Sequence, residues 1–305
     1  MQHQARVVIF CGKGGVGKTT LALAHGLRAA SSGLRTVVVT SHPLEELALA
    51  VSLEGLEDRL PTAARGLFIV HLDPKELLAE VVRENFPVQI LAETVLRSAI
   101  YNNLVEVAPG LKEFYFLARL QQLAERKAAG AEASGRDFDL LLWDAPASGH
   151  FLGTLRAAKN FEVYLSGPLA AAGADLARFF SNPEAIVILP VTTLEEMAIA
   201  ETHDLCRALH TDFHLSPTRV LMNLTSPAIH ATTADAATLE SRLATASPAL
   251  RFAATRALTE RDRAAALARD LAAPTLAIER RRHWTNDIDL LEQIGDALAP
   301  LPSFA

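Results

Sequence analysis

The feature that most constrains this chain is a glycine-rich segment near its beginning, Gly12-Lys-Gly-Gly-Val-Gly-Lys-Thr-Thr20. Residues 7–11 precede it as a short apolar run with the length and β-branched content of a buried strand. Residues 21–30 follow it with the pattern of a helix. The sequence G-x-x-x-x-G-K-[ST] between a strand and a helix marks a phosphate-binding loop, because the glycines let backbone N–H groups converge and the helix N-terminus favours negative charge. The alternative is a tight glycine turn without a ligand.

This context predicts an α/β P-loop NTPase fold, with a mostly parallel central sheet flanked by helices and carrying helical insertions. Lys18 is expected to reach the β- and γ-phosphates, and the Thr19 hydroxyl is expected to bind Mg²⁺. A nucleoside triphosphate with Mg²⁺ is therefore expected, and the adenine-reading residues and the resemblance given below favour ATP as the nucleotide. The expected nucleotide contacts in the loop are Gly14, Gly15, Val16, Gly17, Lys18, Thr19 and Thr20.

Composition excludes several other classes of protein. Half of the 305 residues are hydrophobic, so a large core is available, and a net charge of −6 argues against broad nucleic-acid binding. The two cysteines, Cys11 and Cys206, form no C-x-x-C pair, which fits a reducing cytosol and a cytoplasmic location. The first strand begins too early to leave room for a signal peptide, and no apolar run is long enough to predict a transmembrane segment.

Further apolar runs predict the remaining strands of one domain that spans residues 1–305. Helical patterns lie between them, and two of these, near 75–130 and 157–182, are expected to be helical insertions. In the first, apolar residues recur every three positions from Leu111 to Leu123, which suffices for one buried stripe. The predicted strands are residues 35–40, 67–72, 138–144, 185–191, 219–223 and 274–278.

Three candidate site features follow strands in this order. Asp144 closes an apolar run in the Walker B arrangement and is expected to hold Mg²⁺ directly or through water. Residues 145–150 read as a glycine-containing loop suited to sensing the γ-phosphate, or as a turn followed by a helix cap. Asn223 ends a later strand, where its amide both donates and accepts, so with the loop 279–282 it is expected to read adenine.

Two weaker signals lie in the second half of the chain. Residues 192–196 read as a helix cap in which hydroxyl groups accept backbone N–H bonds. His210 and His214 have the spacing i, i+4, but at a helix end they are better explained as solvated than as metal ligands.

These motifs, in this order, resemble those of the ArsA-like ATPases, which include the arsenite-efflux ATPase and the ATPase that targets tail-anchored proteins. The resemblance rests on residues 13–20, Asp144-Ala-Pro-Ala-Ser-Gly-His150, residues 194–202 and Asn223. Lys13 looks like the extra lysine of the deviant Walker A motif, which in that class reaches the partner's nucleotide across a dimer. By resemblance Lys13 acts in trans and implies a dimer, and the alternative is a solvated or locally phosphate-binding lysine.

The chain also departs from this family. In the family, the switch I segment usually reads S-T-D-P. The aligned residues of this chain are Thr40-Ser-His-Pro43, so His42 stands where a water-positioning Asp is expected. Hydrolysis is then slow, absent or completed by a partner's residue. The metalloid-binding cysteines, the zinc C-x-x-C and the Met-rich helical insertion of family members have no counterpart, since the chain has only three methionines.

Two functions follow from the resemblance. In the first, the chain is part of a dimeric Mg²⁺-dependent ATPase, which is either a homodimer or a heterodimer with a paralogous ATPase. The nucleotide state opens and closes this dimer, and the dimer thereby acts on an unidentified protein partner or client. In the second, the chain is a hydrolysis-deficient nucleotide-binding scaffold subunit beside a catalytic paralogue. Residues 283–305 contain no Lys or Arg, which disfavours a membrane-positioning role, and nothing in the composition supports a DNA-partitioning role.

Overall fold

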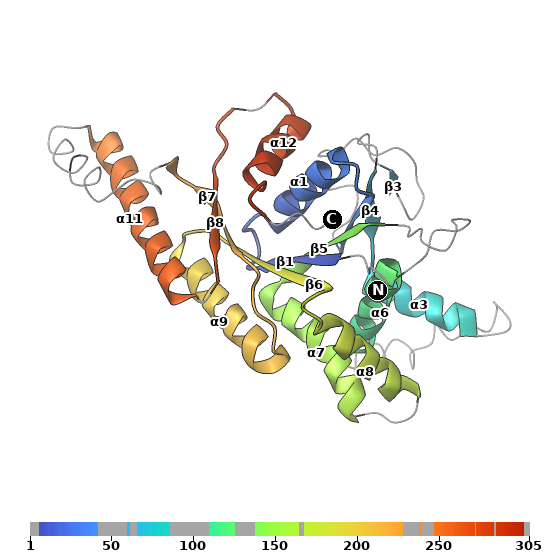
Figure 1. Ribbon diagram of the computed structural model, residues 1–305. Helices are drawn as coiled ribbons and strands as arrows, with labels where there is room; N and C mark the ends of the chain where they lie inside the picture. The colour runs from blue at the N-terminus through green and yellow to red at the C-terminus, as the bar shows by residue number, and fades with distance from the viewer. Residues whose placement is uncertain are drawn as a thin grey trace.

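Parallel strands form the centre of the computed structural model, which describes residues 6–41, 60–61, 66–85, 110–125, 138–164, 168–227, 238, 247–271, 273–283 and 285–301. The sheet has eight strands in the order β3-β4-β2-β5-β1-β6-β7-β8 (Figure 1). Seven strands run parallel, and the short edge strand β3 pairs antiparallel with β4. The strands are β1 Arg6–Gly12, β2 Thr36–Thr40, β3 Leu60–Pro61, β4 Leu67–His71, β5 Leu140–Ala147, β6 Ile186–Thr192, β7 Val220–Thr225 and β8 Thr275–Glu279.

Helices cover both faces of this sheet, which confirms the predicted α/β class. In Figure 1, α1 and α12 lie together on one face, while α6, α7 and α8 lie on the other. No helix in the described part of the chain is both long and apolar enough to cross a membrane. The helices are α1 Lys18–Ser31, α3 Pro74–Asn85, α6 Leu111–Glu125, α7 Ser148–Tyr164, α8 Pro168–Phe180, α9 Glu196–Phe213, α11 Pro248–Asp270 and α12 Asp287–Ala297.

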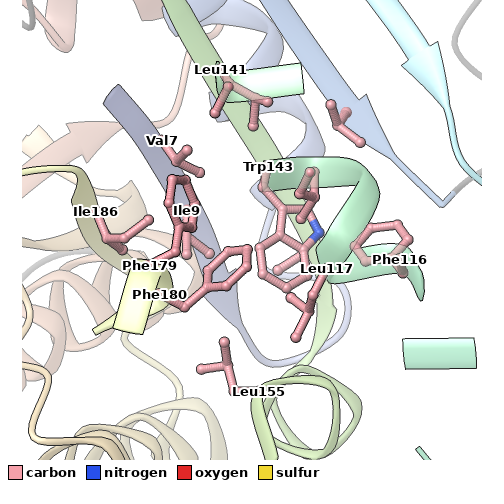
Figure 2. Packing of buried hydrophobic residues seen from close by; sticks show 14 of the residues in the cluster. Val7, Ile9, Phe116, Leu117, Leu141, Trp143, Leu155, Phe179, Phe180 and Ile186 are labelled. Atoms are coloured by element: carbon pink, nitrogen blue, oxygen red, sulfur yellow. The ribbon is translucent and has the colours of Figure 1, made fainter. Parts of the chain in front are cut away.

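The central strand β5 shows how the two faces are filled. Its side chains alternate, so Trp143 belongs to the core under α6, α7 and α8 while Leu142 belongs to the core under α1. Figure 2 shows the Trp143 ring beside Phe116 and Phe180, and the ring centroid lies 5.4 Å from those of Phe116 and Phe151. This aromatic packing fixes the strand directly before Asp144.

The opposite face carries α1, the helix that follows the glycine-rich loop. A Cβ on its Gly26 would lie 3.0–3.3 Å from side-chain atoms of Leu67, Val38 and Leu142, so this helix packs unusually close to the sheet. α12 packs against α1 on the same face of the sheet (Figure 1). The loop is therefore held between a buried strand and a closely packed helix.

The strand and helix predictions hold in most places. The buried stripe on α6 is confirmed, with Leu111 itself only partly buried. At the start of α3, Lys75 N donates to the capping side chain of Asp73 at Oδ1, whereas α9 begins at Glu196 after Glu195, whose side chain makes no capping bond. The hydroxyl cap predicted at residues 192–196 is wrong, because Thr192 belongs to β6 and donates to the carbonyl of its neighbour.

The loop predicted for residues 145–150 is also wrong. β5 continues to Ala147, which pairs with Gly12, and α7 begins at the next residue, Ser148. Proline and glycine in this segment suggested a loop, but β1 extends the strand past Pro146 and Gly149 lies within the helix. The helical pattern predicted near residues 157–182 is confirmed, since the described part of this segment contains the end of α7 and a second helix, α8.

Local residue types also favour a helix from Leu44 and a polar loop over residues 128–136, and both segments lie outside the described residues. The single domain over residues 1–305 and its two helical insertions stay predictions.

A buried histidine on α1 gives a pH-dependent prediction. His25 is 7% exposed and lies beside the Phe10 ring, and burial lowers its pKa from 6.5 to about 4. Between these values the unfolded chain binds a proton that the folded chain does not, so the free energy of unfolding falls as the pH drops from 6.5 to 4, by about 3 kcal/mol. His25→Leu should lose this part of the pH dependence in urea unfolding at pH 7 and 4.5, whereas the exposed His210→Leu should retain it. Equal pH dependence in both variants would contradict the assignment.

Two glycines of the loop give a matched prediction for stability. A Cβ on Gly12, whose φ is 141°, would lie 2.2 Å from the carbonyl oxygen of Val191, whereas a Cβ on Gly14 meets nothing within 4 Å. Gly12→Ala should therefore lower the free energy of unfolding by about 3 kcal/mol or more, and Gly14→Ala by less than about 1 kcal/mol. Urea unfolding at pH 7 compares them, and equal losses would show that β1 and β6 do not approach as described.

Candidate nucleotide-binding site

The glycine-rich loop joins the end of β1 to the start of α1. Gly12, Gly15 and Gly17 have φ values of 141°, 82° and 93°, a backbone region that other residues rarely adopt. Gly17 is the N-cap residue of α1 and makes no side-chain capping bond, so this helix begins without a side chain on its first N–H groups. Gly14 and Gly15 are exposed, and no atom lies within 4 Å of where their Cβ atoms would be. This open backbone with a helix N-terminus fits a phosphate group.

Lys18 brings a positive charge into the loop. Its side chain is buried, and Nζ donates to the carbonyl oxygen of Lys13 at 3.0 Å. Burial lowers the pKa of Lys18, while the negative charges of Asp144 and, more weakly, Glu201 act in the opposite direction. A cation that has lost most of its water is placed to gain from an anion entering the loop.

Asp144 lies fully buried where three elements meet. Thr19 Oγ1, from the first turn of α1, donates to Asp144 Oδ2 at 2.7 Å, and Thr40 Oγ1, at the end of β2, donates to the same oxygen at 3.2 Å. The register of β2 and β5 places Thr40 directly beside Asp144. The structure therefore brings together the two residues predicted to hold Mg²⁺.

These oxygens suit the metal that the fold family implies. Mg²⁺ prefers hard oxygen ligands and in nucleotide sites takes one or two protein side chains together with phosphate oxygens and water. Thr19 and Asp144 supply a hydroxyl and a carboxylate of this kind. In the described part of the chain no three His, Cys, Asp or Glu side chains gather into a metal site, which a phosphate-completed Mg²⁺ site does not require.

Asn223 reaches the same loop from β7. It is 6% exposed, and its Nδ2 donates to the carbonyl oxygen of Val16 at 2.8 Å. The sequence predicts that this amide binds the base of a nucleotide. In the structure its nitrogen is used by the loop itself, and the base-reading role stays a prediction.

The remaining predicted residues lie at the edges of this cluster. The pairing of Gly12 with Ala147 places Ser148 next to the start of the loop, and Ser148 Oγ is buried with no hydrogen-bond partner among the described residues. Lys13 is half-buried in the loop, and Thr20 lies next to Thr19 in the first turn of α1. His42 lies outside the described residues, so its position beside the loop stays a prediction.

Sequence reasoning missed Thr40 as a partner of Asp144. Thr40 is the last residue of a predicted strand, but its contact depends on the register between β2 and β5, which local sequence does not specify. A second missed feature is a cavity of about 470 Å³ beyond the end of β7, next to Leu224. Its lining comes from the β6–α9 connection, β7, α11 and Arg280, so it includes one residue of the loop 279–282, whose adenine-reading role stays a prediction.

Several known proteins have sequences similar to that of this chain. A "Putative arsenical pump-driving ATPase" of Prosthecochloris vibrioformis is 28% identical over 235 residues, which are 72% of this chain and 53% of that protein. The protein Rv2184c of Mycobacterium tuberculosis is 31% identical over 172 residues, 53% of this chain and 39% of that protein. The ATPase BagA of the same organism is 24% identical over 203 residues, 65% of this chain and 58% of that protein. The chain thus spans about half the length of the curated relatives it matches.

A family match covers the site described above. Residues 5–173 match the family described as Anion-transporting ATPase, which is more than half of the chain. The matched range contains the glycine-rich loop, Thr19, Lys18 and Asp144, and it agrees with the predicted resemblance to ArsA-like ATPases. The chain therefore belongs to the anion-transporting ATPase family.

Proposed function

We propose that this chain binds ATP with Mg²⁺ at the glycine-rich loop and hydrolyses it. The observation that carries this proposal is the convergence of Lys18, Thr19 and Asp144 from α1 and β5 on one side of that loop. Membership of an ATPase family supports ATP as the nucleotide. Phosphoryl transfer needs positioning and charge neutralisation more than covalent chemistry, and this cluster has the groups for both.

Each side chain has a definite role in this proposal. Lys18 and the backbone N–H groups of the loop bind the phosphates and offset their negative charge. Thr19 and Asp144 hold Mg²⁺, which when bound neutralises charge on the phosphate oxygens. Because Asp144 is fully buried, its carboxylate stays fixed by the hydroxyls of Thr19 and Thr40 when no metal is present. Thr40 is thus a positioning residue for the metal-binding carboxylate.

The proposal extends to a dimer that acts on a protein partner or client. Lys13 precedes the exposed glycines of the loop and is itself half-buried, so its side chain begins at the surface of the site. By resemblance it reaches the nucleotide of a second subunit, either another copy or a paralogous ATPase. Opening and closing of such a dimer would transmit the nucleotide state to the client.

The names of several relatives mention driving an arsenical pump. The thiols of this chain do not support that function. Soft metalloids bind thiolates. Cys11 and Cys206 are both buried, and burial raises the pKa of Cys11 strongly and that of Cys206 to about 11. These two thiols are therefore packing groups, and arsenite is not the proposed ligand of this site.

The second candidate function is a nucleotide-binding scaffold subunit that does not hydrolyse ATP. His42, in the position of the switch I aspartate of family members, favours it. Turnover by the purified chain alone decides between the two. Steady hydrolysis without a second protein removes the scaffold function, while activity only after addition of a paralogous ATPase supports it.

The metal-binding role of Asp144 gives the first prediction for function. Asp144→Asn should keep ATP binding in EDTA but lose the gain in affinity that Mg²⁺ gives, and should reduce hydrolysis by about 100-fold or more. Titration calorimetry and phosphate release measure the two effects. Asp139→Asn is the matched control, since it changes an exposed carboxylate at the beginning of the same strand segment. Equal Mg²⁺ dependence in Asp144→Asn and wild type would remove Asp144 from the metal site.

The role of Lys13 is tested by mixing two inactive variants. If Lys13 acts in trans, a dimer of Lys13→Ala with Lys18→Ala contains one site with both lysines intact, so an equal mixture should recover about a quarter of wild-type hydrolysis, given random pairing in a symmetric dimer. If Lys13 acts within its own subunit, neither site is complete and the mixture stays inactive. Light scattering of each variant with Mg²⁺ and a non-hydrolysable ATP analogue shows whether dimers form.

A further inference from the structure

One buried hydrogen bond connects the phosphate-binding loop to a strand that is not its neighbour. Asn223 Nδ2 on β7 donates to the carbonyl oxygen of Val16 at 2.8 Å, and the two residues are 207 positions apart. β6 lies between β1 and β7 in the sheet, so the Asn223 side chain reaches the loop across the end of β6. Only the amide NH₂ can donate to a carbonyl, so at least one of its two N–H groups is used by the loop.

This bond fixes the orientation of a peptide group that matters for phosphate binding. In a planar trans peptide the C=O and N–H bonds point in opposite directions. With the Val16 carbonyl held toward Asn223, the N–H of Gly17 points away from β7. Gly17 is the N-cap of α1, and its N–H belongs to the set that the loop offers to an anion.

Gly17 and Asn223 also fit together sterically. A Cβ on Gly17 would lie 2.4 Å from Asn223 Nδ2, so the amide fills the space that a side chain at position 17 would take. Gly17 has a φ of 93°, which already favours glycine there. The glycine allows both the loop conformation and the close approach of the amide.

A distortion of β7 is centred on the same asparagine. β7 pairs regularly with β8 up to Met222, and the register shifts before Thr225. Within the shift, Leu224 has a φ of 58°, one of only two positive values among the described residues other than glycine. Irregularities of this kind re-aim a side chain from its place in the ladder. The distortion therefore coincides with the residue that is turned toward the loop.

From these observations we propose that Asn223 is a positioning residue for the phosphate-binding loop, acting through the Val16 carbonyl. The inference rests on the proposed nucleotide-binding function and deepens it. Asn223 stabilises the conformation of the loop whatever base the nucleotide carries. A residue that reads the base would affect only ligands that have one.

Inorganic tripolyphosphate separates these roles because it has phosphates and no base. Asn223→Ala should weaken the binding of ATP, GTP and tripolyphosphate by one common factor of about tenfold, the loss expected for one buried hydrogen bond. Asn223→Asp should weaken all three at least as much, because a carboxylate cannot donate to the Val16 carbonyl. Unchanged tripolyphosphate binding together with a lower ATP-to-GTP preference would overturn the proposal in favour of base reading.

A second measurement does not require any ligand. In the ligand-free chain, Asn223→Ala should speed hydrogen exchange in peptides covering residues 12–20, while Thr225→Val, two residues further along the same strand, should leave that exchange unchanged. Unchanged exchange in Asn223→Ala would overturn the positioning role. Wild-type protein that binds neither ATP nor tripolyphosphate would instead contradict the proposed function, and hydrogen exchange would still decide the role of Asn223.

Discussion

The site depends on one buried carboxylate. Asp144 is removed from water at the centre of the sheet, a placement that costs several kcal/mol unless hydrogen bonds or charges compensate it. Thr19 and Thr40 donate to it from α1 and β2, and the positive charge of Lys18 lies close enough for the two groups to interact. Because Asp144 lies on β5 and its partners lie on α1 and β2, the carboxylate can be satisfied only when the loop, α1 and the central strands are in their native places.

The surrounding fold keeps this arrangement rigid. The packing of Trp143 holds β5 from one face, and the close approach of α1 at Gly26 holds the loop from the other. Asn223 adds a third fixed point from β7. Packing and hydrogen bonds thus connect the loop to Asp144, α1 and β7, so the proposed nucleotide site is in direct contact with both α1 and β7.

Much of this fold could be predicted because buried parallel strands leave a plain signal, short apolar runs followed by polar residues. The glycine-rich loop and Asp144 could be recognised as well, because each is marked by residues that are adjacent in the sequence. What could not be predicted depends on pairing between distant segments. Thr40 meets Asp144 through strand register, Asn223 reaches Val16 through a distortion of β7, and pairing with β1 extends β5 beyond Pro146 where local residue types suggested a loop.

The proposed function requires Thr19 and Asp144 to form one metal-binding pair at a nucleotide site. A crystal structure of the chain with Mg²⁺ and a non-hydrolysable ATP analogue tests it most directly. We expect the Thr19 hydroxyl to give up its bond to Asp144, both residues to face a single Mg²⁺, and Lys18 to contact the phosphates. An analogue bound elsewhere, or a Thr19–Asp144 hydrogen bond that persists with the analogue in the loop, would contradict it.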